Sequence, residues 1–240
     1  INWFKIGVPF EAQPESQNFI TNKNSIRLLH CPSHPALKGS DKILSVVNEL
    51  KSEGYNVDLT TLKGKPNSVV LEHIKNSHIV IDQLYSDTPL AGLALESISF
   101  GVPVLVCGYY HQIYQADVIK RGLPPATFTH PDHFKKQLID MIEHHDLYLE
   151  KARKLRALLE SEWHLKVVSK RILSLIEDGP RDSWSVDPEE IDYVYGGGLS
   201  KARLINILIK IQKKYGEDGF MLNKRLSTKI VNLASKRPED

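Results

Sequence analysis

Residues 26–62 read IRLLHCPSHPALKGSDKILSVVNELKSEGYNVDLTTL, and this stretch predicts the fold. The apolar run at Ile26–His30 is typical of a buried strand. Ser40–Glu53 places apolar side chains at helical spacing behind a residue that can cap a helix, and Gly54 follows as a stop signal. Val57–Leu62 alternates as a strand does. A strand, a helix and a second strand in this order predict an α/β fold with a Rossmann-like parallel sheet flanked by helices.

The same alternation continues along the chain. We expect a helix at 67–75, a strand at 79–82, a helix at 92–100, a strand at 104–107, a helix at 131–143 and a long helix at 147–176 that bends near Trp163. Residues 108–130 carry Gly122 and Pro124-Pro125, which interrupt regular structure, and this segment is expected to be a loop.

Composition divides the chain into four parts. Residues 1–25 are expected to be an interdomain linker with an incoming strand, 26–177 the α/β domain, 178–195 a Pro-, Asp- and Glu-containing linker, and 196–240 a helical extension. The extension has an apolar helix face within 199–215, opposite lysines and arginines. We expect that face to dock on the domain or on a neighbouring copy of the chain. Contact with a membrane surface is the alternative.

The overall composition excludes several classes of protein. The chain has 240 residues, 41% of them hydrophobic and 25% charged, which is typical of a globular protein. Its formal net charge of +2 gives no reason to expect nucleic-acid binding, and no apolar run is long enough for a membrane span. Cys31 and Cys107 are expected to be reduced, buried thiols, which predicts a cytoplasmic protein.

One candidate binding loop lies between the first strand and its helix. Lys38-Gly39 comes directly before the capped helix, where a lysine and free backbone N–H groups can bind a phosphate. The spacing is not that of a P-loop. A solvated turn is the alternative interpretation of the same residues.

A second candidate is a carboxylate in an otherwise apolar helix. Residues 87–106 read DTPLAGLALESISFGVPVLV, with Glu96 as the only charged residue of the expected helix. The loop before this helix follows the third strand, so its N–H groups face the same edge of the sheet. A carboxylate accepts two hydrogen bonds, and a ribose diol donates two. Together the two loops predict a nucleoside diphosphate site, unless Glu96 is simply exposed.

The motifs LLHCPSHPALKGSDKILSVVNEL, IVIDQL and LALESISFGVPVLV together resemble the C-terminal, donor-binding domain of GT-B glycosyltransferases, over roughly residues 5–177. The likeness is greatest to the retaining group that includes glycogen synthase. It implies that Lys38 of the Lys38-Gly39 loop binds the donor diphosphate and Glu96 the ribose. It also implies that the backbone at Pro89, Leu90, Ala91 and Gly92 contacts phosphate and sugar.

The sequence departs from the family pattern at informative positions. Thr88 stands where the family usually has a first glutamate, and Ser33 where an arginine is common. His34 or Arg27 could replace that arginine. The chain is therefore identified as an atypical member. The resemblance further implies an N-terminal acceptor-binding domain, which is either missing from this chain or supplied by another polypeptide.

The resemblance predicts hexosyl transfer from a UDP- or GDP-linked sugar to a glycan or other hydroxyl acceptor, with no cofactor and no metal. A catalytically inactive nucleotide-sugar-binding or scaffold protein of the same fold is the first alternative. A flavodoxin-like signalling domain is the second, but His30-Cys31-Pro32 lacks the acidic cluster that it would need. Two further residues have open assignments: Lys63 lines a nucleobase pocket or is solvated, and Tyr110 touches the sugar or packs.

Overall fold

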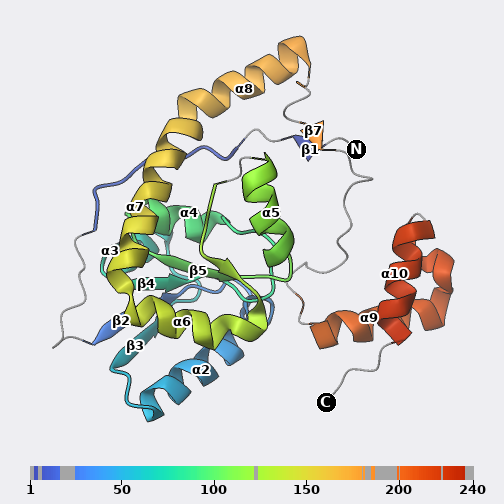
Figure 1. Ribbon diagram of the computed structural model, residues 1–240, viewed down its shortest axis with the longest axis horizontal. Coiled ribbons are helices and arrows are strands. Elements are labelled where there is room, and N and C mark those ends of the chain that lie inside the picture. The colour runs from blue at the N-terminus through green and yellow to red at the C-terminus, as the bar shows by residue number, and fades with distance from the viewer. Residues whose placement is uncertain are drawn as a thin grey trace.

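The computed structural model describes residues 3–4, 7–16, 25–121, 124–179, 181, 185–186, 199, 201–222 and 224–235. Five parallel strands form its main sheet, in the order β3-β2-β4-β5-β6 (Figure 1). Their bounds are Ile26–His30 (β2), Val57–Thr61 (β3), Ile79–Ile81 (β4), Val104–Cys107 (β5) and Phe128–Thr129 (β6). The predicted α/β, Rossmann-like parallel sheet is confirmed.

The strand order identifies where such a sheet binds ligands. Counted within this sheet alone, the order is 2-1-3-4-5, in which the chain reverses its direction of travel between β2 and β4. The loops that follow these two strands leave the sheet toward opposite faces. Ligands of open α/β sheets bind in the crevice beyond the carboxyl ends of the strands at such a point.

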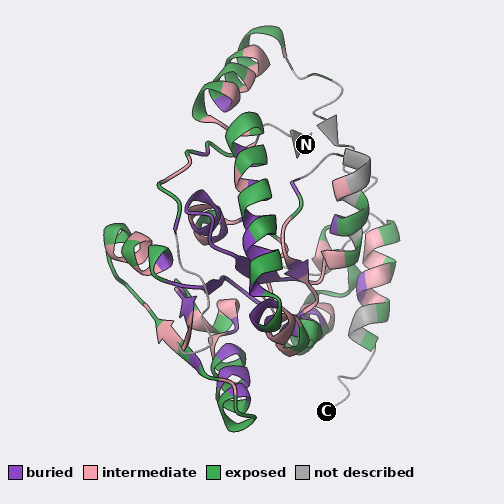
Figure 2. Cartoon of the chain, turned by 60° about the vertical axis from the view of Figure 1, so that its left-hand side comes forward, coloured by how far each residue is buried: buried purple, intermediate pink, exposed green. Residues whose placement is uncertain are grey.

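Helices cover both faces of the sheet. They are α1 (Pro35–Lys38), α2 (Ser40–Ser52), α3 (Asn67–Lys75), α4 (Gly92–Ser99), α5 (His111–Arg121), the 3-10 turn η1 (Pro131–His133), α6 (Phe134–Glu143), α7 (His145–Glu162) and α8 (Leu165–Asp178). Apolar side chains of α3, α4 and α7 pack on one face, and those of α2 and α6 on the other. Figure 2 shows the buried residues gathered on the strands and the inner sides of the helices.

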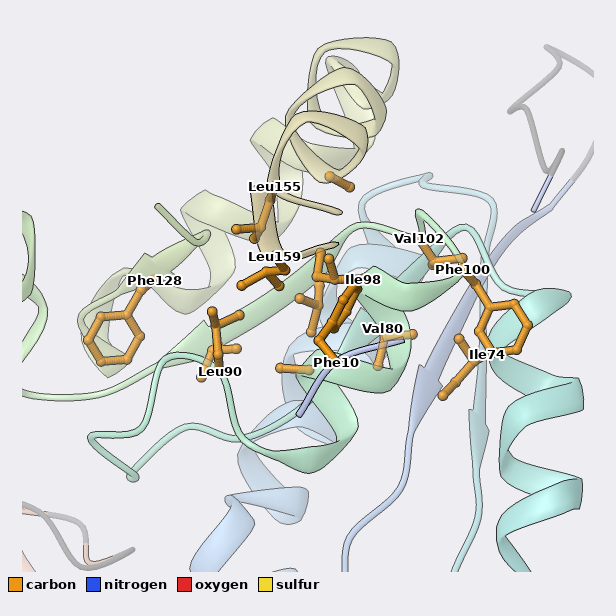
Figure 3. Packing of buried hydrophobic residues seen from close by; sticks show 14 of the residues in the cluster. Phe10, Ile74, Val80, Leu90, Ile98, Phe100, Val102, Phe128, Leu155 and Leu159 are labelled. Carbon is orange, nitrogen blue, oxygen red and sulfur yellow. The ribbon is translucent and has the colours of Figure 1, made fainter. Parts of the chain in front are cut away.

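The alternation along β4 shows how the sequence produces these two layers. Val80 packs among the residues of one face, whereas Ile79 and Ile81 pack on the other, and all three are fully buried. Figure 3 shows the first layer from close by, with Leu155 and Leu159 of α7 above Ile98 of α4. Continuous apolar strands of this kind are expected only where both sheet faces are covered.

The prediction of a loop at 108–130 is wrong, since this segment contains α5 and β6. Tyr114 explains the helix, because its ring is buried and edge-on to Phe128. Its hydroxyl donates to the Pro124 carbonyl and accepts from the Ala126 N–H at 3.1 Å. Pro124 and Pro125 do not prevent regular structure throughout the segment, because they lie between the end of α5 and the start of β6.

The long C-terminal helix of the domain divides where a bend was predicted. α7 ends at Glu162, and α8 begins at Leu165 after Trp163 and His164. The described part of the N-terminal segment lies against this break and against α4. Phe10 N–H donates to the Trp163 carbonyl at 2.8 Å, and Gln13 N–H to the Ser99 carbonyl at 3.0 Å.

Short strands occur inside both segments that were predicted as linkers. Trp3–Phe4 (β1) pairs antiparallel with Ser185–Val186 (β7). The rest of the predicted 178–195 linker, apart from residues 178, 179 and 181, lies outside the described residues. Among the described residues, no helix combines the length and the apolar character needed to cross a membrane.

The helical extension folds as a hairpin of two helices, α9 (Lys201–Tyr215) and α10 (Lys224–Ser235), joined through the 3-10 turn η4 (Glu217–Phe220). Leu204, Ile205 and Leu208 are buried together with Ile230 of α10. Much of the apolar face predicted at 199–215 is therefore covered by α10 of the same chain, although Ile207 stays exposed. A contact between copies of the chain through this extension stays a prediction.

Candidate functional site

Lys38 lies at the predicted edge of the sheet, bound to residues that follow β4. Its Nζ donates to Asp82 Oδ1 at 2.6 Å and to Gln83 Oε1 at 2.8 Å. The Lys38 side chain is 18% exposed, whereas that of Asp82 is fully buried. An ammonium group has three N–H donors, and these two bonds use two of them. Lys38 therefore keeps one donor that can reach a ligand.

The Lys-Gly dipeptide explains how the lysine reaches this position. α1 is a single turn that begins at Pro35, and Gly39 ends it in the left-handed region at φ 77°. The Lys38 carbonyl accepts from Leu84 N–H at 3.1 Å, which ties the turn to the loop after β4. A Cβ on Gly39 would lie 2.8–2.9 Å from three side-chain atoms of Leu84. The position requires glycine for conformation and for space.

His30 joins the ends of three elements at this edge of the sheet. Its Nδ1 lies 2.9 Å from the Ile81 carbonyl oxygen and its Nε2 lies 2.8 Å from the Ser40 hydroxyl. Because a carbonyl only accepts, Nδ1 carries the proton, and the Ser40 hydroxyl donates to Nε2 of the neutral ring. This bridge joins β2, β4 and the start of α2. It was not predicted, because the sequence does not show which strand lies beside β2.

Glu96 lies on α4, partly exposed, and its Oε1 accepts from Asn67 Nδ2 at 2.7 Å. Cys31 directly follows β2, and the pKa of its thiol is influenced by the charges of Glu96, Asp82 and Lys38. Burial is the main cause that raises the pKa of this thiol to about 11; the negative charges of Glu96 and Asp82 contribute to the rise, and the positive charge of Lys38 opposes it. Cys31 is only partly buried, so the expectation of a buried thiol is wrong for this residue. Lys38 of α1 follows β2 and Glu96 of α4 follows β4, so both belong to elements that come after neighbouring strands of the sheet.

In the segment that leads into α4, Gly92 is exposed to solvent and the side chain of Leu90 is buried. Ala91 is the extended N-cap of α4 and makes no side-chain capping bond. Gly92 is exposed, and a Cβ added to it would meet nothing within 4 Å. Pro89 is half-buried, whereas Leu90 is buried in the core, so only its backbone can serve a ligand. The backbone N–H groups at the start of α4 can thus donate hydrogen bonds to an anion.

Gln83 connects this loop to Lys38. Its Oε1 accepts from Lys38, and its Nε2 donates to the Thr88 carbonyl at 3.2 Å. Sequence reasoning did not identify Asp82 or Gln83 as site residues. The available signal was their position, since a carboxylate and an amide directly after a buried strand lie at the edge where Lys38 also lies.

The remaining predicted residues lie on the same edge but differ in their contacts. His34 is exposed as the N-cap of α1, and its carbonyl accepts from Lys38 N–H at 3.0 Å. Lys63 is exposed in the loop after β3, the neighbour of β2. Tyr110 donates its backbone N–H to Asp87 Oδ1 at 3.0 Å and packs against the core, which supports the packing assignment.

One cavity lies away from these residues. It has a volume of about 520 Å³ and lies at the amino ends of β5 and β6, between Pro103, Phe128 and α7 residues such as Leu155. Neither Lys38 nor Glu96 lines it. Three imidazoles, His111, His130 and His133, have ring centroids 5.2–6.4 Å apart. Even so, the described residues contain no group of three or more ligands able to hold a metal ion.

Buried histidines predict a pH dependence of stability. Burial lowers the pKa of His30 and of His145 from the ordinary value of 6.5. As the pH falls below that value, the unfolded chain binds protons that the folded chain does not, so the free energy of unfolding decreases. We expect the urea midpoint to fall steadily between about pH 7 and pH 5.5. His145→Leu should make this dependence shallower than the exposed control His34→Gln does, and equal slopes would contradict the assignment.

Comparison with models of known protein families gave no match, and comparison with curated protein sequences gave none either.

Proposed function

We propose that this chain is the donor-binding half of a glycosyltransferase, which transfers a hexosyl group from a nucleotide diphosphate sugar to a hydroxyl acceptor. The observation that carries the proposal is the placement of Lys38 and Glu96. Lys38 of α1 follows β2 and Glu96 of α4 follows β4, and the strand order reverses between these two strands. That point is where open α/β sheets bind nucleotides.

The chemistry of the site suits each part of such a donor. The third N–H of Lys38 and the uncapped start of α4 are donors for a diphosphate. The Glu96 carboxylate can accept both hydroxyls of a ribose. During transfer, Lys38 and the loop amides would offset the charge that develops on the departing nucleoside diphosphate. The acceptor would bind on another domain, whose closure excludes water.

One observation favours the second candidate, a nucleotide-sugar-binding or scaffold protein without turnover. Lys38 is already paired with the buried carboxylate of Asp82, which reduces the positive charge that a diphosphate meets. Thr88 also offers no carboxylate to the sugar. The UDP- or GDP-linked donor is common to both candidates, and so is the predicted cytoplasmic location. Turnover alone distinguishes them.

Titration calorimetry of the chain with UDP, GDP and their hexose derivatives tests the binding step. We expect Glu96→Gln to weaken binding about 10- to 100-fold, because it removes the charged acceptor of two hydrogen bonds. Glu72→Gln is the matched control, since Glu72 is an exposed glutamate of α3, and it should leave binding unchanged. A wild-type chain that binds none of these nucleotides would refute both candidates. Donor hydrolysis or transfer, assayed with an acceptor domain present, then separates them.

A further inference from the structure

The α9–α10 hairpin concentrates positive charge. Residues 199–235 hold eight lysines and arginines against two acidic residues, a formal charge of +6, whereas the whole chain carries +2. The remainder of the chain is therefore at −4. This separation of charge is not apparent from the overall composition, and it gives the hairpin an electrostatic character of its own.

The lysines of α9 form one stripe on the outer side of the hairpin. Lys210, Lys213 and Lys214 are exposed and lie at spacings of three and four residues, so they share a face. Helical periodicity places that face opposite Leu204 and Leu208, which are buried against α10. None of these three lysines takes part in an ion pair with another described residue. The stripe is thus available to an external anion.

The stripe ends at an exposed apolar tip. Met221 is 94% exposed, Leu222 is 43% exposed and Tyr215 is 59% exposed. Tyr215 lies against η4, since a Cβ on Gly219 would be 2.5 Å from its Cβ, and Lys214 Nζ lies 4.7 Å from the centre of its ring. Figure 1 shows where α9 and α10, the two most C-terminal helices, pack together. Glu217 and Asp218 also lie in this turn, but the lysines and arginines on both sides outnumber them.

We propose that the α9–α10 hairpin docks the protein on a membrane surface that contains anionic lipids. The lysine stripe lies over the lipid headgroups, and Met221 and Leu222 enter the interface with Tyr215 beside them. Basic side chains bordering exposed apolar ones are the combination that binds such surfaces, and aromatic side chains favour the headgroup level. A nucleic acid would neutralise the lysines, but it offers no hydrocarbon to the tip. The inference does not depend on the proposed function.

Co-sedimentation of the whole chain with lipid vesicles tests this inference. We expect binding to vesicles of phosphatidylcholine with phosphatidylglycerol, weakened by added salt, and none to vesicles of phosphatidylcholine alone. Lys210→Glu, Lys213→Glu and Lys214→Glu together should weaken binding at least about 100-fold, because each lysine near an anionic surface contributes about fivefold. Equal binding to both kinds of vesicle would overturn the proposal.

A matched variant separates the stripe from net charge. Lys42→Glu, Lys166→Glu and Lys170→Glu together produce the same net charge, but they alter exposed positions on α2 and α8. This variant should retain binding to anionic vesicles to within a few fold. If it loses as much as the α9 variant does, the attraction is a general one and the proposal fails. Circular dichroism and a thermal melt show whether each variant is folded.

The tip is tested in the same way. Met221→Ser with Leu222→Ser should weaken vesicle binding about tenfold or more, since both side chains lose an apolar environment. Leu173→Ser with Ile176→Ser is the control, because these side chains are also apolar and exposed, but they lie on α8. If the Met221→Ser, Leu222→Ser variant binds vesicles as well as this control does, the proposal that the tip inserts into the membrane is wrong. Lysine-dependent binding of a short RNA or DNA duplex, without vesicle binding, would overturn the membrane assignment in favour of a nucleic acid.

Discussion

Lys38→Ala is expected to lower the free energy of unfolding by about 3–5 kcal/mol, which urea denaturation near neutral pH would measure. The physical reason is the partner that it leaves behind. Asp82 is fully buried, and Lys38 Nζ at 2.6 Å is the cation paired with it. Without the ammonium group, a carboxylate stays in the interior uncompensated or must take up a proton.

The double variant Lys38→Met, Asp82→Asn is the control for this expectation. It removes both charges and keeps most of the side-chain volume, so it should recover most of the lost stability. A Lys38→Ala variant as stable as one with alanine at the exposed Lys42 would show that the pair contributes little. The same reasoning makes Lys38→Ala a poor probe of donor binding, because loss of binding and loss of fold would coincide. Glu96→Gln avoids this difficulty.

Gly39→Ala is expected to lower the free energy of unfolding by about 2–5 kcal/mol. A residue with a Cβ in the left-handed region costs about 1–2 kcal/mol, and crowding a packed site costs about 1–3 kcal/mol more. The crowding comes from Leu84, whose side-chain atoms lie 2.8–2.9 Å from the position of the new methyl group. Urea denaturation measures the sum.

Gly54→Ala separates the two contributions. Gly54 has a positive φ of 94°, but a Cβ there meets nothing within 4 Å. Gly54→Ala should therefore lose only the free energy of about 1–2 kcal/mol that the left-handed backbone conformation costs. If both alanine variants lose the same stability, the contact with Leu84 makes no contribution. If the contact with Leu84 does contribute, adding Leu84→Val to Gly39→Ala should recover part of the lost stability.

Much of the fold could be predicted because its signals are local. Asn67–Lys75 is helical over the predicted range, since its apolar positions and the following break lie within one window of sequence. The apolar strands β2, β4 and β5 were recognisable for the same reason. α5 and β6 were missed because their stability comes from Tyr114 packing on Phe128 and bonding the loop between them. A contact between residues so far apart in the sequence cannot be recognised from a short stretch of residues.

The candidate site could be predicted only in outline. Lys38 and Glu96 follow from the rule that the carboxyl ends of parallel strands share one edge. The ion pair of Lys38 with Asp82 depends on β2 lying beside β4, and this follows from strand order and register, which a single sequence does not reveal. Tyr110 and Leu90 were candidates by position, but the direction of a side chain is decided by the packing around it.

The two hydrogen bonds of Gln83 have a mechanical consequence. One end of its amide holds the Lys38 ammonium group, and the other holds the carbonyl of Thr88. If the loop that carries Lys38 or the loop that carries Thr88 moves, the other loop loses a hydrogen-bond partner. The positions of the two loops are therefore coupled. A ligand that engages one of them changes the free energy of engaging the other, and the two halves of a bifunctional ligand would bind cooperatively.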